Sequence, residues 1–394
     1  MAAALTGAMS GQGCVYERGE AWSRGPSMGE RAITIVAVGG ARDDRSTRAV
    51  AQRLRDEAFQ GAQLLIWLGQ PAGKRVSCKE LDAEAGPLRE LRASLEGTPI
   101  YAVGSPAGHR CPGAQWPEAV QPAANYVLEV DGAGRVRLVS SCDEAACKVE
   151  GIGGDARLRL VFVDVSAWIF PELEDEDAVR DLAQLESLLA ALRSEPNAYR
   201  ETPHILVSAL PMESAGSHGL GGWNADATFR HHPESLQAAM AQGVFDGVIA
   251  GYEHNLQYVG DLGWAVKRSA RVWLDRPAFQ IVAGSAGDPD ALHYAAPRTT
   301  ARWQNQALWP ETVSPRAGFA TFRTDGNEAE VALHAKHGRG WKAAHHRVQL
   351  GRPAHPEETA APSQMPCMTC DPVQGSSDGE KWEKRRERMP GATP

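Results

Sequence analysis

The sequence lacks the features of several large protein classes. No apolar run approaches the roughly 18–20 residues that a membrane-spanning helix needs, so we predict no membrane span. The first twenty residues have no basic start and no unbroken apolar stretch, and they do not resemble a secretion signal. The net charge of −8 gives no general attraction to nucleic acids or to anionic membranes. We therefore predict a cytoplasmic protein that binds no nucleic acid.

Motifs of the common catalytic classes are missing as well. There is no GxSxG turn, no Walker A loop, no HExxH helix and no Rossmann glycine fingerprint. Ser105, with His109 nearby, leaves a serine nucleophile open as an alternative, although nothing places a base and an oxyanion hole together. The seven cysteines include a CMTC pair, Cys367 and Cys370, which is either half of a zinc site or two incidental thiols.

The sequence does contain alternating strand-like and helix-like segments. Strands are predicted from short apolar, β-branched runs that often end in glycine: 32–40, 62–70, 98–108, 156–168, 203–211, 243–251, 278–287, 318–324 and 328–336. Helical spacing occurs at 46–59, 84–97, 177–194 and near 233–242, and 126–141 resembles a hairpin that turns at DGAG. This order favours βαβ units and two sheets packed face to face with helices outside.

Composition divides the chain into three parts. Residues 1–30, rich in Gly, Ser and Ala, are predicted to be a disordered leader. Residues 31–345 carry the strand and helix patterns and are predicted to form one α/β domain. Residues 346–394, rich in Pro, Ala and charged residues, are predicted to be a disordered tail.

Five strands are followed by glycine-rich or polar loops, which is where sites gather in α/β sheets. In chain order the loops are VGGARDD, LGQPAGK, VGSPAGH, SALPMESAGSHG and GYEHNLQ. The order and the sequences of these loops resemble those of the calcineurin-like metallophosphoesterases, above all the purple acid phosphatase-like branch. In that branch the loops read roughly GD, GDxxY, GNH, HxP and GHxHNLQ. The resemblance covers about residues 31–345 and implies a four-layer α/β/β/α sandwich of the metallophosphoesterase type.

The resemblance also implies which residues stand at the metal site. Members of the family hydrolyse phosphate esters with two metal ions that clamp the phosphate and activate a water molecule. The family's metal-ligand and catalytic positions fall, in chain order, on Gly40, Gln70, Gly73, Ser105, Pro106, Ala209, Tyr252 and His254. Only His254 matches the family's residue. The resemblance therefore implies a site that keeps its loops and has lost most of its ligands.

Two functions remain open. The first is a catalytically impaired or inactive homologue, without a cofactor, that acts as a binding or interaction module for a protein or a small anionic ligand. The second is an active phosphoesterase with a rearranged centre, in which Asp43 or Asp44, His109 and His254 hold one divalent iron, manganese or zinc ion. His218 matches a family histidine near the substrate phosphate, so His218 and His109 are the candidate catalytic residues.

Structural roles are the simpler alternatives for several of these residues. His254 and His218 can be loop histidines that only fix the backbone. Asp164, directly after a strand, can be a cap or a buried acceptor. His231 and His232 lead into a predicted helix at Pro233. The basic, aromatic stretch at 337–347 is predicted to be a solvated surface.

Overall fold

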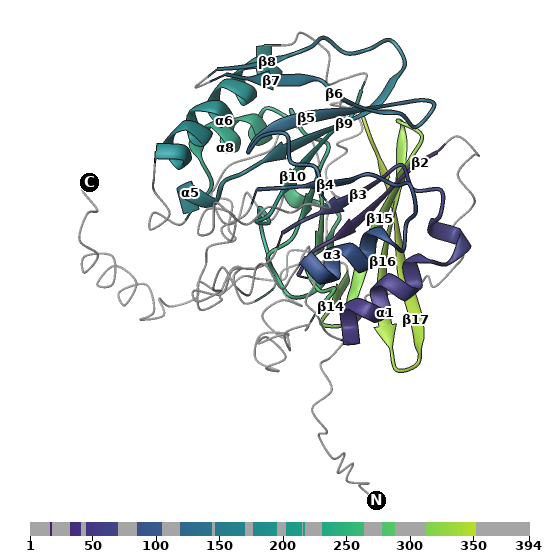
Figure 1. Ribbon diagram of the computed structural model, residues 1–394. Helices are drawn as coiled ribbons and strands as arrows, with labels where there is room; N and C mark the ends of the chain where they lie inside the picture. The colour runs from purple at the N-terminus through teal and green to yellow at the C-terminus, as the bar shows by residue number, and fades with distance from the viewer. Residues whose placement is uncertain are drawn as a thin grey trace, which may run out of the picture. The chain divides into compact units, whose positions relative to one another are not determined.

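Two β-sheets form the framework of the fold (Figure 1). The smaller sheet has six strands in the order β17-β16-β15-β2-β3-β4. Their bounds are β2 (Ile33–Val38), β3 (Leu64–Trp67), β4 (Ile100–Ala102), β15 (Gly318–Thr324), β16 (Glu328–His337) and β17 (Gly340–Gln349). Strands β2, β3 and β4 are parallel, and the other three continue the sheet antiparallel. The loops after β2, β3 and β4 therefore leave the sheet at the same end.

The larger sheet has nine strands in the order β1-β14-β12-β13-β11-β10-β9-β5-β6. Their bounds are β1 (Tyr16–Glu17), β5 (Tyr126–Asp131), β6 (Val136–Leu138), β9 (Ala156–Val163), β10 (His204–Ser208), β11 (Gly247–Ala250), β12 (Leu256–Val259), β13 (Phe279–Ala283) and β14 (Thr312–Ser314). Strands β9, β10, β11 and β13 are parallel, so their following loops also share one end.

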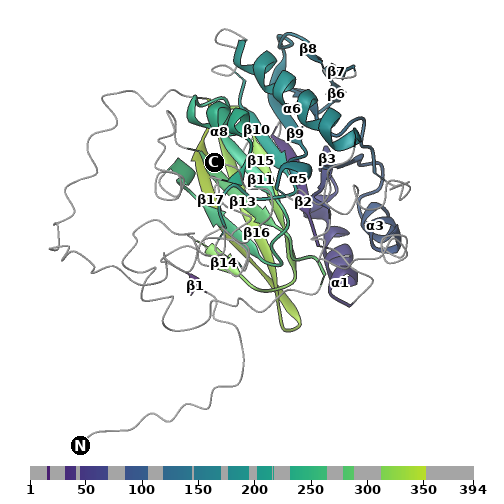
Figure 2. The ribbon, with the colours of Figure 1, turned by 90° about the vertical axis from the view of Figure 1, so that its left-hand side faces the viewer.

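The apolar side chains of the strands alternate between two environments. In β2, Ile35 and Ala37 join the core between the sheets, whereas Val36 and Val38 face a second cluster with helix α1 (Arg45–Leu54) and helix α3 (Ala85–Arg92). Helices α6 (Glu176–Ser194) and α8 (Glu234–Ala241) cover the larger sheet, and their leucines belong to the same apolar cluster as Ile35 and Ala37 (Figure 2). Two short helices, η1 (Glu57–Phe59) and α5 (Ser166–Ile169), complete the described set.

The computed structural model describes part of the chain. The described residues are 16–17, 32–40, 45–69, 85–104, 119–143, 146–169, 176–194, 202–214, 216, 231–263, 278–287 and 312–351. All of them belong to the compact unit Met1–Pro353. Within them, no helix is long and apolar enough to cross a membrane. The domain limits at residues 30 and 345 stay predictions, although Tyr16–Glu17 pairs with β14 and β17 extends to Gln349.

A small hairpin carries a disulfide that the sequence did not predict. Strands β7 (Ser140–Cys142) and β8 (Cys147–Val149) place Cys142 directly opposite Cys147, and the two sulfurs are bonded. The hairpin docks on α6, where the Cys147 backbone N–H donates to the Ser187 hydroxyl at 2.8 Å. Disulfides are rare in the cytosol, and the cytoplasmic location stays a prediction.

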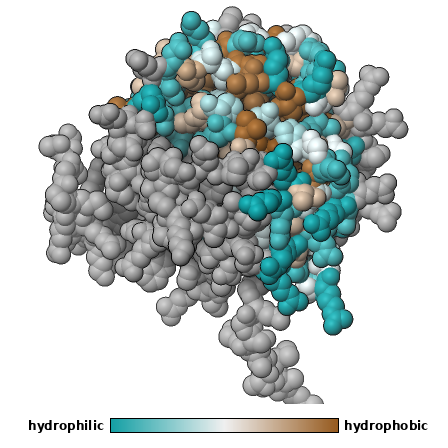
Figure 3. Space-filling model, in the orientation of Figure 1, coloured by the Kyte–Doolittle hydropathy of each residue, from teal (hydrophilic) through white to brown (hydrophobic). Residues whose placement is uncertain are grey.

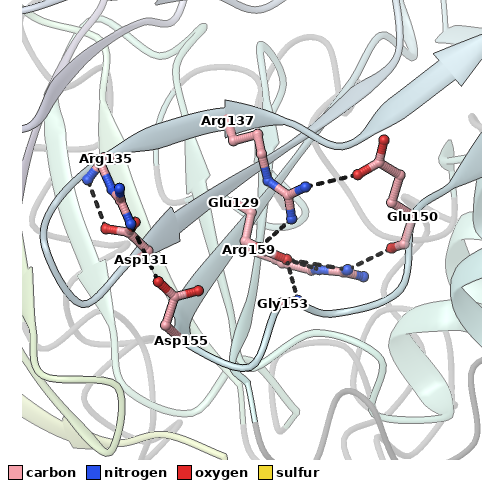
Figure 4. Close-up of polar contacts among 8 residues, drawn as sticks. All are labelled: Glu129, Asp131, Arg135, Arg137, Glu150, Gly153, Asp155 and Arg159. Atoms are coloured by element: carbon pink, nitrogen blue, oxygen red, sulfur yellow. Dashed lines mark hydrogen bonds and ion pairs between the residues drawn. The ribbon is translucent and has the colours of Figure 1, made fainter.

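A buried ion pair joins neighbouring strands of the larger sheet (Figure 4). Glu129 on β5 lies opposite Arg159 on β9, and their side chains are 3% and 0% exposed. The Arg159 guanidinium donates to the Glu129 carboxylate at 3.3 Å and to the Glu150 carbonyl at 2.7 Å. Arg137 on β6 donates to the other carboxylate oxygen at 2.9 Å, and the Gly153 N–H also donates to Glu129. One carboxylate therefore ties together three strands and the loop at 150–153.

Removing this carboxylate is expected to destabilise the protein strongly. Glu129→Ala removes the buried carboxylate that pairs with the Arg159 guanidinium, so the free energy of unfolding should fall by about 3–5 kcal/mol. The matched control is Arg135→Ala, because Arg135 is 76% exposed and pairs with Asp131 at the surface, where removal of the pair should cost far less. Urea denaturation of the two variants measures the difference, and equal losses would contradict the prediction.

His334 is a buried imidazole on the helix-covered face of the smaller sheet. Its ring stacks on Phe319 with centroids 4.6 Å apart and meets the edge of Phe59 at 5.1 Å. Its Nε2 lies 3.1 Å from the Thr321 hydroxyl. Burial lowers the pKa of His334 from 6.5 to about 3, with smaller contributions from His345 and Arg53.

The lowered pKa predicts a loss of stability in acid. Between pH 6.5 and about 3 the unfolded chain binds a proton at His334 that the folded chain does not. Stability from this group is therefore complete above pH 6.5 and falls as the pH drops, by up to about 1.4 kcal/mol per pH unit. Chemical denaturation from pH 7 to 4 should show a steeper loss for the wild type than for His334→Gln. Parallel profiles would contradict the prediction.

Candidate functional site

The predicted site loops of the two sheets meet through backbone contacts. The Gly40 N–H, after β2, donates to the Gly69 carbonyl at 3.1 Å, after β3. The carbonyls of Gly39 and Gly40 accept hydrogen bonds at 2.9 Å from the N–H groups of Ala286 and Gly287, after β13. Glycine loops from both sheets are thus joined at the ends of their parallel strands, as the position of the loops in the sequence predicts.

Gly40 fills a space that admits no side chain. Its φ is +63°, a backbone conformation in which side chains are strained, and a Cβ atom there would lie 2.1 Å from the Gly284 carbonyl oxygen. The family places its first metal-binding aspartate at this position. The structure therefore offers no room at Gly40 for a side chain, with or without a carboxylate.

The loop that contains His254 packs against the same glycines. A Cβ atom at Gly284 would lie 1.8 Å from the Glu253 carbonyl oxygen, and one at Gly216 would lie 1.9 Å from a Glu253 carboxylate oxygen. Glu253 is 1% exposed, whereas His254 is partly exposed. Among the described residues, Tyr252 alone has a positive φ outside glycine, at 66°, and it is 5% exposed. This loop is buried against its neighbours and held in an uncommon backbone conformation.

Two further close contacts join the loops of the predicted site. A Cβ atom at Gly251 would lie 2.9 Å from Leu68, after β3, and the Gly251 N–H donates to the Ala209 carbonyl at 3.2 Å. A Cβ atom at Gly104, after β4, would lie 2.0 Å from an oxygen of Asp164, after β9. The other Asp164 oxygen accepts the Ser166 N–H at 2.8 Å, which confirms the buried acceptor role.

Buried amides hold the loop after β10. The Gln280 side chain accepts the Met212 N–H at 2.8 Å and donates to the Glu213 carbonyl at 2.5 Å. Gln257 donates to the Ser214 hydroxyl at 3.0 Å and to the Asn255 side chain at 2.7 Å. All six residues are at most 3% exposed. These polar groups satisfy one another, so they fix the loop rather than present donors to a ligand.

Tyr126 on β5 makes a hydrogen bond from the larger sheet to the smaller sheet. Its hydroxyl donates to the Ala102 carbonyl at 2.6 Å, and its ring stacks on Phe162 with centroids 4.4 Å apart. Burial raises the pKa of Tyr126 well above its ordinary value, and Tyr101 adds to the shift. The phenol therefore stays neutral and bridges the two sheets as a hydrogen-bond donor.

The structure thus brings together Gly40, Ala209 and Tyr252 at the joined loop ends. Other predicted site residues lie outside the described residues: Asp43, Asp44, Gln70, Ser105, His109 and His218. His232 is buried directly before Pro233, the N-cap of α8, and its carbonyl accepts a hydrogen bond from Gln237, which confirms the structural reading of the His-His-Pro stretch. Sequence reasoning missed the packing role of Glu253, because a glutamate in a polar loop gives no sign in the sequence that it is buried.

The described residues do not fit a dinuclear metal centre. Gly40 and Ala209 have no donor atoms, and a two-metal site needs several carboxylates and imidazoles from different loops. Within the ranges that the structure describes, no three His, Cys, Asp or Glu side chains are grouped to hold an ion.

The tight contact at Gly40 predicts an unusually large effect of one methyl group. Gly40→Ala adds strain and a clash with the Gly284 carbonyl, so the loss of stability should exceed about 3 kcal/mol. Gly97→Ala is the matched control, because Gly97 has a φ of +77° with nothing within 4 Å of the added atom, and it should cost only about 1–2 kcal/mol. Thermal and urea unfolding measure both, and a similar loss in the two variants would refute the close contact.

Comparisons with known proteins identify the fold but no family. No family model matches the chain, and no curated protein matches it. The structure is similar to GAP50, the anchor in the inner membrane complex of Plasmodium, with 13% identity, a TM-score of 0.51, and 81% of this chain and 89% of that chain covered. It is also similar to purple acid phosphatase PPD1 from yellow lupin (Lupinus luteus) seeds, with 12% identity and a TM-score of 0.50.

The second comparison covers 81% of this chain and 54% of the lupin enzyme. At these identities the likeness establishes the fold alone. The chain has the mixed α/β fold of the metallophosphoesterases, as the five loops predict.

Proposed function

We propose that this chain is a metallophosphoesterase-fold protein that binds a partner and does not hydrolyse phosphate esters. The contact between Gly40 and Gly284 carries the proposal, because it occupies the place where the family's first ligand carboxylate would stand. Function resides in the site rather than in the fold. Here the loops that would surround two metals pack against one another instead.

The same contacts favour a protein partner over a small anion. An anion site at such loops would use free backbone N–H groups. The N–H groups of Gly40, Gly284, Ala286 and Gly287 donate to carbonyls of neighbouring loops, at 2.9–3.2 Å. These four donors are therefore already used within the fold.

A binding role is also compatible with the fold. GAP50, which has the same fold, is the anchor in an inner membrane complex. An anchor acts by contact with other molecules. That comparison supports a binding role for a chain of this fold.

Metal content is the direct test of the proposal. We expect less than one metal ion per chain, measured by elemental mass spectrometry after growth with iron, manganese and zinc. His254→Ala should leave this value unchanged, because one histidine without its companion ligands holds no ion tightly. His337→Ala, at the end of β16, is the matched control histidine outside the loop.

The opposite result would support the second function. One or more metal ions per chain, lost in His254→Ala and kept in His337→Ala, would overturn the proposal. Asp43 or Asp44 and His109 would then be tested as the remaining ligands of a single iron, manganese or zinc ion. Hydrolysis of p-nitrophenyl phosphate, measured on the same samples, would show whether that ion is catalytic.

A further inference from the structure

Strand β17 is a long and regular edge of the smaller sheet. Its ten residues pair with β16 without a break, from His337 opposite Gly340 to Glu328 opposite Gln349. Within the described ranges, no strand pairs with its other side. The β16–β17 hairpin is visible as the yellow-green pair of strands in Figures 1 and 2.

This edge lacks most of the devices that protect sheet edges. Natural edge strands are shortened, bulged, interrupted by proline or covered. β17 contains no proline, its register with β16 shows no bulge, and it is as long as β16. Charged side chains are the protective device that it does carry. A row of backbone donors and acceptors at such an edge can take up an extended segment as an added strand.

The charge of this region is opposite to that of the chain. Residues 312–351 contain six Lys or Arg and three Asp or Glu, whereas the whole chain has a net charge of −8. β17 itself carries Lys342 and Arg347, both exposed, together with two histidines and no acidic residue. In the space-filling view, hydrophilic side chains gather at the lower right of the coloured surface, in the part of the view where Figure 1 places α1, α3 and this hairpin (Figure 3).

The acidic residues of β16 are already engaged with β17. The Glu330 carboxylate lies 2.7 Å from Nδ1 of His345, and Glu328 accepts a hydrogen bond from the Gln349 side chain. Neither carboxylate lies on β17 itself. An extended partner along the outer edge would therefore meet a strand whose own charged residues are basic.

We infer that β17 binds an acidic protein segment in an extended conformation, which adds to the edge of the smaller sheet as a seventh strand. The inference rests on the proposed function, because it names the surface and the kind of partner for the binding role. Backbone hydrogen bonds would supply affinity. Lys342 and Arg347 would select acidic side chains, because opposite charges on facing strands stabilise the pair.

Two other occupants fit the strand less well. A second copy of β17 paired antiparallel over its full length would set Lys342 opposite Arg347 at two places, and facing like charges are destabilising. Single-stranded nucleic acid needs exposed aromatic rings on which bases stack. Trp341 is half-buried, with its ring 5.8 Å from that of Phe319, so it offers no free stacking face.

The test uses the full chain and a labelled ten-residue peptide in which pairs of glutamates alternate with pairs of threonines. An added strand of this peptide carries glutamate on both faces, as the opposite faces of Lys342 and Arg347 require. Fluorescence anisotropy should show binding that weakens as salt is added. Reversing both charges, with Lys342→Glu and Arg347→Glu together, should weaken binding at least about tenfold. The matched control reverses Arg89 and Arg92 on α3, which are also exposed, and should leave the affinity within about twofold.

A peptide control separates strand addition from simple charge attraction without changing the protein. Replacing two threonines of the peptide by proline keeps its charge but removes backbone donors, so binding should be lost. Circular dichroism and thermal melting confirm that each protein variant is folded.

The inference is overturned if the glutamate peptide does not bind, or if both charge reversals have the same effect. Equal binding of the proline peptide, or binding of single-stranded DNA in its place, overturns it too. Metal content measured on the same samples distinguishes failure of this inference from failure of the proposed function. Less than one metal ion per chain, together with no peptide binding, would reject the binding surface at β17 and leave the proposed function standing.

Discussion

The rest of the site depends on one close approach of backbones, between Gly40 of the smaller sheet and Gly284 of the larger sheet. A carbonyl oxygen takes the place that a Cβ atom would need, so the contact excludes every residue with a side chain at Gly40. Glu253 in turn packs its own carbonyl against Gly284. The two sheets are joined at this contact, at the position where the resemblance of the loops implies the family's first metal ligand.

Much of the fold follows from local sequence, because buried strands and amphipathic helices carry strong periodic patterns. The runs predicted at 32–40 and 203–211 are β2 and β10, and the helix predicted at 177–194 is α6. The resemblance of the loops also places the family's first ligand position at Gly40, which has no side chain. It does not reveal that the position is filled, because the filling atom belongs to Gly284, which lies 244 positions further along the chain.

The strands that sequence reasoning missed lack such patterns. Leu256–Val259 follows a polar string, and its buried Gln257 satisfies its amide within the protein, so hydropathy alone indicates a loop. Gly340–Gln349 is half-exposed on both faces, with basic residues on each, and its stretch was predicted to be solvated surface. An edge strand obtains its conformation from the neighbour with which it pairs rather than from its own residues. Its existence becomes apparent only with the sheet.

A fold can keep its framework while its chemistry changes, because the two depend on different atoms. The core between the sheets needs apolar volume, which side chains such as Ile35 and Phe162 supply. A metal centre needs a few donors at exact positions, and replacing one by glycine leaves that core intact. Under the proposed function, close packing of the loops at Gly40 and Gly284 would not compete with space for a substrate. Under the proposed binding role, contact with a partner would use a different surface, such as the regular basic edge strand β17.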